Sequence, residues 1–405
     1  MLAMYTRILE LPRRSFLLLG PRGCGKTTWL REKLPQAQWY NLLLDREHVR
    51  LLRDPGLFRR EIQALPSGSW VVVDEVQKLP ALLNDVHDAL AAAPKRWRFA
   101  LTGSSARRLR RGDANLLAGR VIARQMYPIT AAELQSRPVV DDLLRFGCLP
   151  LVRTERVLAT RVDLLEAYVS TYLTQEIRAE ALVRSLESFT RFLEVAALAN
   201  GQVTNVAGLA RDAGVARPTV QGYFEVLDDT LLGSWLPAWR PRAKVKEVQH
   251  PKFYLFDCGV VRALAHRLRE PLDGAERGQL LETLVLNELR AHISYSGCGG
   301  ELAYYRTPSG TEVDFVWTRG KHRIGIEVKA SALWKPEYGR ALHDLWDQKT
   351  LTECHAIYLG DTPQQDGQIN VRPLFAFLEE LAGGKILPGS KLGRTTARAR
   401  RTAKA

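Results

Sequence analysis

Short apolar runs alternate with helical patterns over roughly the first 135 residues. Runs at 16–19, 70–73 and 99–101 have the length of strands, and a helical pattern at 27–33 follows the first of them. Such alternation predicts a parallel sheet with crossover helices. The near-continuous apolar run that ends at Val73 is typical of a strand covered on both faces. We therefore expect an α/β domain over residues 1–135.

The middle of the chain has a helical pattern. Apolar residues recur at helical spacing from about 161 to 199, with no Pro or Gly between them. We expect a helical lid or linker over 136–200. The stretch 203–232 then indicates a helix, a tight turn at Gly214 and a second helix, which is a helix-turn-helix or winged-helix pattern over 201–248. The second helix carries Glu225, Asp228 and Asp229, so we interpret this part as structural rather than as a DNA reader.

The last third of the chain returns to mixed patterns. An apolar run at 253–256 precedes a helical stretch at 279–292, and residues alternate with strand period at 311–317 and 324–330. These predict a separate α/β domain over 249–382. Residues 383–405 are rich in Gly, Thr, Ala, Arg and Lys, and we expect a disordered basic tail there.

Composition is that of a globular protein. The 405 residues are 46% hydrophobic and 25% charged, and this length favours two or three domains. Five scattered cysteines indicate neither a zinc framework nor a disulfide ladder, which suits a reducing cytoplasm. No apolar stretch has the length of a signal peptide or a membrane span, so we expect a soluble, cytoplasmic protein with no membrane partner.

The net charge of +14 favours an anionic partner such as nucleic acid. Seven of the surplus cations lie in the predicted tail, at 385–405, which contains no acid. Two internal basic patches could also contact phosphates, although a solvated surface explains either equally well. The patches are Arg107, Arg108, Arg110 and Arg111, and Arg240, Arg242, Lys244 and Lys246.

A phosphate-loop motif follows the first predicted strand. It runs through Gly20, Pro21, Arg22, Gly23, Cys24, Gly25, Lys26, Thr27 and Thr28. Glycines allow the tight turn in which backbone N–H groups cradle phosphate oxygens, and the next helix adds its dipole. In such a loop Lys26 would neutralise the β and γ phosphates of ATP, and the Thr27 hydroxyl would hold Mg²⁺.

Two acids end the second apolar strand. Asp74 and Glu75 directly follow the run 70–73, which places both carboxylates at the sheet edge where ligands bind. We expect Asp74 to bind the magnesium ion, directly or through a coordinated water. Glu75 would polarise the water that attacks the phosphate.

Together these motifs resemble those of AAA+ ATPases. That family places a polar residue on the strand beyond the acidic motif, where it positions the water and senses the γ-phosphate. The corresponding strand here is 97–101, followed by Thr102, Gly103, Ser104 and Ser105. The resemblance makes Thr102 and Ser104 the candidates and leaves open which of them acts.

The resemblance is closer to a prokaryotic family of predicted ATPases that join an AAA+ module to a C-terminal domain of uncertain function. It rests on residues 20–28, 73–78, 101–105, 117–120 and 127–128, and resumes at the C-terminal motifs. Arg120 lies where such a protein could offer a cation to a γ-phosphate, in the same chain or in a neighbour. A surface arginine is an equal alternative, and a homo-oligomer is possible.

The C-terminal strand patterns carry a second motif. Asp314 precedes Glu327 and Lys329, and the strand period puts the last two on one face. This spacing resembles the signature of restriction-endonuclease-like, metal-dependent nucleases. The resemblance implies that Asp314 and Glu327 ligate Mg²⁺ and that Lys329 orients water and stabilises charge at the phosphate.

That fold usually adds an acid from a preceding helix. Glu282 and Glu288 are six positions apart, so they project in different directions and only one can face a metal. We favour Glu282 as the third ligand, by resemblance. Nuclease-like domains also persist as binding platforms without catalysis, so an inactive domain stays an alternative.

We therefore expect an ATPase that uses ATP and Mg²⁺ and whose nucleotide state controls a nuclease-like domain acting on nucleic acid. The alternative is an ATP-dependent switch that binds DNA or a protein through an inactive C-terminal domain.

Overall fold

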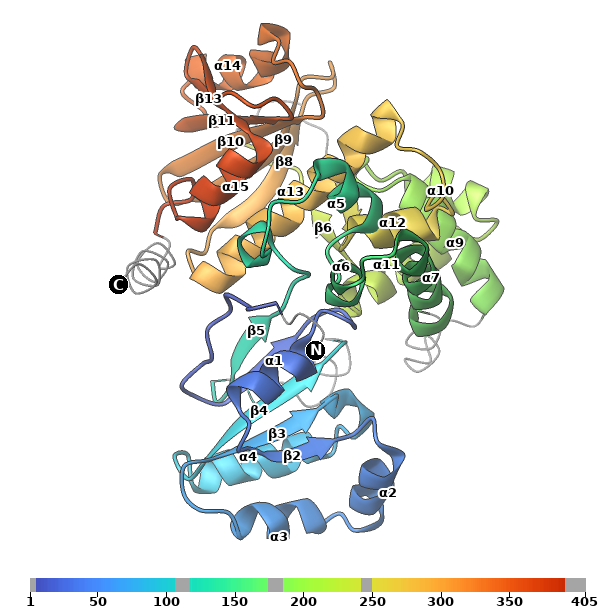
Figure 1. Cartoon of the computed structure of the whole chain (residues 1–405), viewed down its shortest axis with the longest axis vertical. Helices are drawn as coiled ribbons and strands as arrows, with labels where there is room; N and C mark the ends of the chain where they lie inside the picture. The colour runs from blue at the N-terminus through green and yellow to red at the C-terminus, as the bar shows by residue number, and fades with distance from the viewer. Residues whose placement is uncertain (1–4, 106–116, 118, 174–184, 242–249, 390–405) are drawn as a thin grey trace. The chain divides into compact units, whose positions relative to one another are not determined.

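The computed structural model describes residues 5–105, 117, 119–173, 185–241 and 250–389 (Figure 1). The chain divides into two compact units. The N-terminal unit comprises Leu9–Tyr127 and Leu227–Leu232, and the C-terminal unit comprises Met1–Ile8, Pro128–Val226 and Gly233–Ala405. Each unit is described by itself.

The N-terminal unit is built on a parallel sheet of five strands in the order β2-β3-β4-β1-β5. The strands are β1 (Phe16–Leu19), β2 (Gln38–Asn41), β3 (Ser69–Asp74), β4 (Trp97–Gly103) and β5 (Ile122–Gln125). The helices are α1 (Lys26–Lys33), α2 (Asp45–Arg53), α3 (Leu57–Gln63) and α4 (Leu82–Ala92), with a short 3-10 turn at Val76–Lys78. The predicted parallel α/β architecture is confirmed, and the three predicted strands form its centre.

Helices cover both faces of this sheet (Figure 1). Val71 and Val73 of β3 share a buried cluster with Phe58 of α3 and Val86 of α4. On the other face, the ring of Phe16 makes an edge contact with Trp29 of α1. Alternate residues of each strand thus pack against opposite layers, which is why the central strands are apolar throughout.

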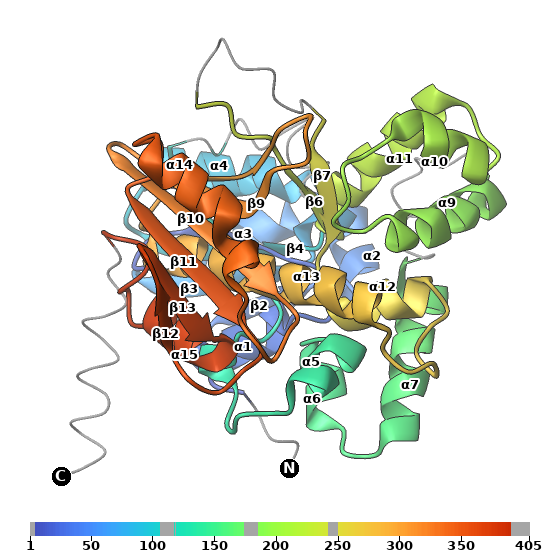
Figure 2. The same ribbon diagram turned by 90° about the horizontal axis from the view of Figure 1, so that it is seen from above.

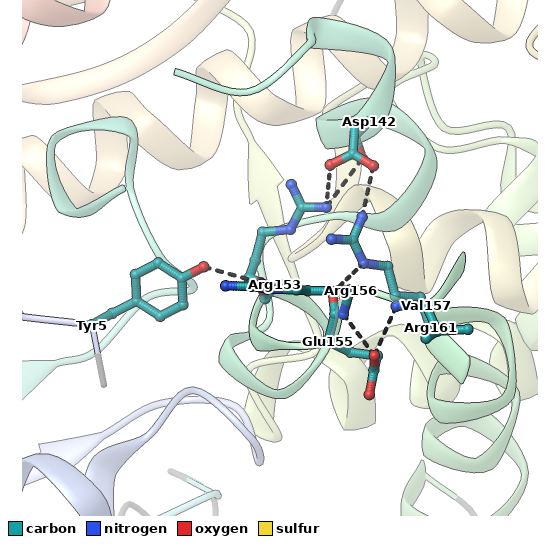
Figure 3. Close-up of polar contacts among 7 residues, drawn as sticks. All are labelled: Tyr5, Asp142, Arg153, Glu155, Arg156, Val157 and Arg161. Atoms are coloured by element: carbon teal, nitrogen blue, oxygen red, sulfur yellow. Dashed lines mark hydrogen bonds and ion pairs between the residues drawn. The ribbon is translucent and has the colours of Figure 1, made fainter. Parts of the chain in front are cut away.

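The predicted helical region contains several short helices in place of one long pattern. They are α5 (Val140–Phe146), α6 (Pro150–Thr154), α7 (Leu158–Ala167) with a π-helical turn at Tyr168–Leu173, and α9 (Leu186–Leu198). Figure 3 shows how Asp142 of α5 joins the next two helices. Its Oδ2 accepts from Arg153 at 2.6 Å and its Oδ1 accepts from Arg161 at 2.8 Å. The Tyr5 hydroxyl donates to the carbonyl of Arg153 at 3.0 Å and ties the start of the chain to the same place.

The helix-turn-helix pattern is formed by α10 (Val206–Asp212) and α11 (Arg217–Asp229). Gly214 in the turn has a φ of 67°, a backbone conformation that favours glycine. A two-stranded antiparallel sheet follows, made of β6 (Gly233–Leu236) and β7 (Lys252–Leu255), and α12 (Cys258–Leu264) comes next. Strands β6 and β7 pair across the position 248/249, and the boundary predicted there stays a prediction.

A mixed sheet of six strands, in the order β12-β13-β11-β10-β9-β8, forms the end of the C-terminal unit. Its strands are β8 (Glu301–Arg306), β9 (Glu312–Arg319), β10 (His322–Lys329), β11 (Glu353–Tyr358), β12 (Gln364–Asp366) and β13 (Ile369–Pro373). The long helix α13 (Gly274–Ser296) precedes them, and α14 (Arg340–Asp347) and α15 (Leu374–Ala382) are interleaved with them. Short 3-10 turns lie at Ala131–Glu133 and Pro336–Gly339. The expected second α/β region is confirmed.

Helices α14 and α15 flank this sheet (Figure 2). Cys354 and Ala356 of β11 share a buried cluster with Leu342 of α14, whereas the ring of His355 contacts Phe377 of α15 at 6.1 Å. Because successive strand residues point to opposite faces, the two helices cover opposite faces.

The chain remains packed beyond the point where we expected disorder. Ile386 and Leu387 are buried, so the tail predicted to start at 383 is anchored by an apolar pair over its first residues. Residues 390–405, which carry most of the tail cations, lie outside the described residues, as do the patch at 107–111 and residues 242–246 of the second patch. No helix in the described part of the chain is long and apolar enough to cross a membrane.

Glu133 joins two segments of the C-terminal unit that are far apart in the sequence. Its Oε1 accepts from Arg7 Nε at 3.0 Å and from the Ile8 backbone N–H at 2.9 Å, and its Oε2 accepts from the Thr130 backbone N–H at 3.0 Å. The Arg7–Glu133 ion pair is buried, and breaking one partner of such a pair typically costs about 3–5 kcal/mol. Within the C-terminal unit, Glu133 therefore ties the segment that ends at Ile8 to the segment that begins at Pro128.

Glu288 of α13 lies close to Glu133, and its ionisation should make the stability of the protein depend on pH. Burial, followed by the nearby charge of Glu133, raises the pKa of Glu288 from about 4.5 to about 8, although the Ala131 backbone N–H donates to its Oε1 at 2.7 Å. Between these pH values the folded chain keeps a proton that the unfolded chain has lost, so stability falls as the pH rises from about 4.5 to 8. Glu288→Gln keeps an acceptor and cannot ionise. We therefore compare the free energy of unfolding of Glu288→Gln with that of the wild type. We expect the difference, variant minus wild type, to increase by on the order of 2–4 kcal/mol from pH 5 to pH 8.

Denaturant unfolding of both proteins at the two pH values measures this difference. The matched control is Glu194→Gln, at an exposed position on α9, which should show no such trend. A constant difference between Glu288→Gln and the wild type across this pH range would contradict the prediction.

Candidate functional site

The phosphate loop connects β1 to α1. Gly23 and Gly25 have φ values of 82° and 91°, which only glycine adopts readily. Gly20 needs its small size for another reason, since a Cβ there would lie 2.5 Å from the carbonyl oxygen of Met126. Helix α1 begins directly at Lys26, so its first backbone N–H groups face the loop. The loop therefore needs glycine at 23 and 25 for their positive φ angles and at 20 for lack of space.

Lys26 lies beneath the loop, with 4% of its surface exposed. Its Nζ donates to the carbonyl oxygens of Gly20 at 2.6 Å and Pro21 at 3.1 Å. A buried ammonium group without an anion needs such acceptors. Phosphate oxygens entering the loop would offer it stronger, charged ones.

Thr27 and Asp74 face each other across the site. The Thr27 hydroxyl donates to Asp74, at 2.8 Å from Oδ2 and 3.1 Å from Oδ1. Burial raises the pKa of Asp74, and the hydroxyl groups of Thr102 and Thr27 partly oppose that rise. A hydroxyl and a carboxylate oxygen at this distance fit Mg²⁺, which takes few protein ligands and completes its shell with phosphates and water.

Thr102 connects the two acids to β4. Its hydroxyl donates to Asp74 Oδ1 at 2.6 Å and accepts from the Glu75 backbone N–H at 2.8 Å. Glu75 has a φ of 60°, a left-handed conformation that costs a non-glycine residue on the order of 1–3 kcal/mol. The Thr102 hydroxyl therefore fixes the acid side chain and holds the turn at the end of β3.

Ser104 contacts the other acid. Its hydroxyl donates to Glu75 Oε2 at 3.1 Å and accepts from Gln77 Nε2 at 2.9 Å, while Gln77 Nε2 also donates to Glu75 Oε2 at 2.5 Å. Of the two candidates, Thr102 thus contacts the Asp74 carboxylate, and Ser104, which directly follows β4, contacts the Glu75 carboxylate. Sequence analysis missed Gln77, because its contact depends on the left-handed backbone of Glu75.

The other residues of the predicted loop differ in their exposure. Pro21 and Cys24 are buried, and Thr28 is exposed. Arg120 is also exposed.

A second group of charged side chains lies in the C-terminal unit. The ladder of β9 and β10 pairs Phe315 with Ile326, and Asp314 and Glu327 are the next residues along each strand. Asp314 Oδ2 accepts from the Val328 backbone N–H at 2.7 Å, and Lys329 donates to Glu327. Burial and the charge of Asp314 raise the pKa of Glu327 well above its usual range.

Glu282 of α13 belongs to the same group, whereas Glu288 contacts Ala131 elsewhere. Burial and the charge of Asp314 raise the pKa of Glu282 to about 7. Its Oε2 accepts from the Tyr254 hydroxyl at 2.8 Å and lies 3.5 Å from Lys252 Nζ.

Lys252 and Tyr254 come from β7, and sequence analysis did not identify them. Lys252 Nζ is also 2.5 Å from Glu312 Oε1. Burial lowers the pKa of Lys252, but the charges of Glu282, Asp314 and Glu312 outweigh it and raise the pKa above its ordinary value. This group is therefore a buried network of acids and lysines.

The three predicted metal ligands Glu282, Asp314 and Glu327 all belong to this network. Within the described ranges, no three His, Cys, Asp or Glu side chains are grouped so that they could hold a metal ion. Glu282, Asp314 and Glu327 influence one another electrostatically, yet two lysines take the places beside them. Glu327 Oε2 is buried without a hydrogen-bond partner.

Comparison with known proteins agrees with the geometry of the phosphate loop. Residues 12–135 match the family model of an AAA domain. This match identifies the N-terminal part of the chain as a nucleotide-binding domain of the ATPase type. Residues 137–270 and 277–377 match two models described as domains of unknown function, DUF8612 and DUF4143.

Similar whole proteins give no further function. Uncharacterized proteins of Mycobacterium bovis and Mycobacterium tuberculosis are each 26% identical over 357 residues, which cover 85% of this chain and 76% of theirs. The structure of the Aeropyrum pernix ORC1 protein in complex with DNA matches with a TM-score of 0.33 and 14% identity, over 64% of this chain and 87% of that one. A score this low supports no conclusion.

Replacing Thr102 with Val tests the link between the two acids. Valine keeps the shape of threonine but leaves the buried Glu75 N–H without its acceptor, which costs about 1–3 kcal/mol. We expect a lower thermal midpoint for Thr102→Val, and a much smaller change for Thr102→Ser, which keeps the hydroxyl. Equal thermal midpoints for Thr102→Val and the wild type would show that this hydroxyl does not hold the turn.

Proposed function

We propose that this protein binds ATP with Mg²⁺ and hydrolyses it. The observation that carries the proposal is the contact of Thr27 with Asp74, directly beside the buried Lys26. A glycine-rich loop, a lysine and a carboxyl group at one edge of a parallel sheet support the proposal.

Each side chain has a role in the proposed reaction. Lys26 and the backbone N–H groups of the loop bind the β and γ phosphates. Thr27 and Asp74 would hold the magnesium ion, which supplies Lewis-acid stabilisation of charge on the phosphates. Glu75 accepts a hydrogen bond from the attacking water and orients it, and Thr102 and Ser104 keep the two acids in place.

Arg120 is a candidate for a cation at the γ-phosphate, in the same chain or in a neighbouring copy. Its exposure is compatible with either source. A homo-oligomer, a cytoplasmic location and the five-part domain division are further parts of this proposal.

Removing the ammonium group of Lys26 tests the ATPase assignment. We expect Lys26→Ala to reduce phosphate release from ATP by roughly 100-fold or more, because no other described side chain replaces that charge beneath the loop. The matched control is Lys33→Ala at the far end of α1, which should hydrolyse ATP at the wild-type rate. Equal phosphate release by Lys26→Ala and the wild type would refute the site.

A second proposed function concerns the C-terminal network. The adjacent Asp314 and Glu327 with Lys329, and the net positive charge of the chain, favour a nuclease-like module that acts on nucleic acid and is controlled by the nucleotide state. Lys329 could stabilise negative charge at a phosphate. Because the carboxylates do not form a metal site as they stand, we derive no cleavage step through a metal.

Cleavage of plasmid and oligonucleotide DNA and RNA in the presence of Mg²⁺ and ATP tests this module. A nuclease should lose about 100-fold or more in rate in Glu327→Gln, because an amide can neither exchange a proton nor bind a cation as a carboxyl group does. Glu301→Gln, at an exposed position of the same sheet, is the matched control. If the wild type cleaves none of these substrates, an ATP-dependent binding switch with an inactive C-terminal module replaces the nuclease proposal.

A further inference from the structure

Gln77 forms a closed set of hydrogen bonds with Glu75 and Ser104. The two N–H bonds of its amide reach Glu75 Oε2 at 2.5 Å and Ser104 Oγ at 2.9 Å, and Ser104 Oγ donates to Glu75 Oε2 at 3.1 Å. An ionised carboxylate only accepts, so the amide must turn its nitrogen towards Glu75. Every donor in this triangle has an acceptor, and all three residues are buried.

The backbone around Gln77 makes this contact possible. Glu75 is left-handed, with φ 60° and ψ 51°, and the 3-10 turn Val76–Lys78 follows it, closed by a bond from the Lys78 N–H to the Glu75 carbonyl at 2.9 Å. The turn brings the side chain two positions later back to the acid. In a regular strand the side chains of Glu75 and Gln77 would also lie on one face of the sheet. They would, however, be farther apart along the strand.

Glu75 is therefore tied to β4 at two points. Thr102 accepts from its backbone N–H at 2.8 Å, and Ser104, together with Gln77, holds its Oε2. Both side-chain bonds fall on that one oxygen. Within the described residues, Oε1 is left as the oxygen that a water can use. A carboxylate orients water only if one oxygen stays within hydrogen-bond reach of it, so fixing the other oxygen reduces the rotamers that miss the water.

We propose that Gln77 is a positioning residue for ATP hydrolysis, which holds the Glu75 carboxylate against Ser104 so that Oε1 faces the attacking water. This inference rests on the proposed ATPase function and adds a residue outside both the phosphate loop and the acidic pair. The proposed effect of Gln77 on the reaction runs through the Glu75 carboxylate. It acts on the rate of the chemical step and leaves ATP affinity unchanged.

Gln77→Met tests the inference, since methionine has a similar length and no N–H donor. We expect kcat for ATP hydrolysis to fall about 10- to 100-fold, which is part of what a positioned general base contributes. KM and the equilibrium affinity for ATP with Mg²⁺ should stay within about threefold, because uniform binding is not affected. The matched control, Gln63→Met at an exposed position of α3, should behave as the wild type.

A double-mutant cycle separates positioning from a general structural effect. In single-turnover experiments on Glu75→Gln, adding Gln77→Met should cause no further loss, because no carboxylate remains to be held. Ser104→Ala removes one bond of the triangle by a smaller change. Ser104→Ala should lower kcat about 3- to 10-fold and leave the ATP affinity unchanged. If Gln77→Met does not fold, this variant tests the inference in its place, and an undiminished kcat would then overturn it.

Four results would overturn the inference. An undiminished kcat in Gln77→Met would do so while leaving the ATPase proposal intact. A parallel loss of ATP affinity and kcat, or a full further loss in the Glu75→Gln background, would make Gln77 a structural residue only. A wild-type protein that binds ATP but does not hydrolyse it would remove the proposed activity and this inference together.

Discussion

The hydrogen bond from Thr27 to Asp74 joins the first helix of the N-terminal unit to the end of its third strand. It requires that the phosphate loop and the acidic pair lie at the same edge of the sheet, which parallel strands β1, β4 and β3 provide by pairing side by side. Glycines at 20, 23 and 25 let the loop close over Lys26, and Thr102 holds Asp74 from the far side. Charge, hydroxyl groups and backbone N–H groups thus converge at one point.

The central part of this fold could be predicted because burial on two faces leaves a clear pattern. Strands β1, β3 and β4 lie inside the sheet and read as apolar runs, but β2 and β5 are its edges and carry polar residues such as Gln38 and Arg124. Edge strands show no continuous apolar run, so pattern alone does not find them. The same holds for β12, the short edge of the second sheet.

The candidate site could be predicted where its residues form motifs that are continuous in the sequence. The phosphate loop is one such motif, and Asp74 with Glu75 is another. Their closeness in space follows from the parallel pairing of the strands that precede them. Gln77 is different, because its contact with Glu75 depends on a left-handed residue that no residue pattern announces. Lys252 contacts Glu282 and Glu312 from a separate hairpin, and such a contact between distant segments is fixed only by tertiary packing.

The C-terminal network combines strong burial with incomplete neutralisation. Glu282, Glu312, Asp314 and Glu327 face Lys252 and Lys329, and the raised pKa values of Glu282, Asp314 and Glu327 show how costly the remaining negative charge is. The resemblance to nucleases identified the acids but not the lysine from β7 that occupies the space beside Glu282. A cation bound to the Glu282 carboxylate would have to compete with that lysine.

Equilibrium titration of the intact protein with labelled ATP, with Mg²⁺ and with EDTA in its place, tests the central claim most directly. The account predicts saturable binding that weakens when magnesium is removed, and a loss of that magnesium sensitivity in Asp74→Asn. Absence of saturable binding, or identical curves with and without magnesium in the wild type, would contradict it.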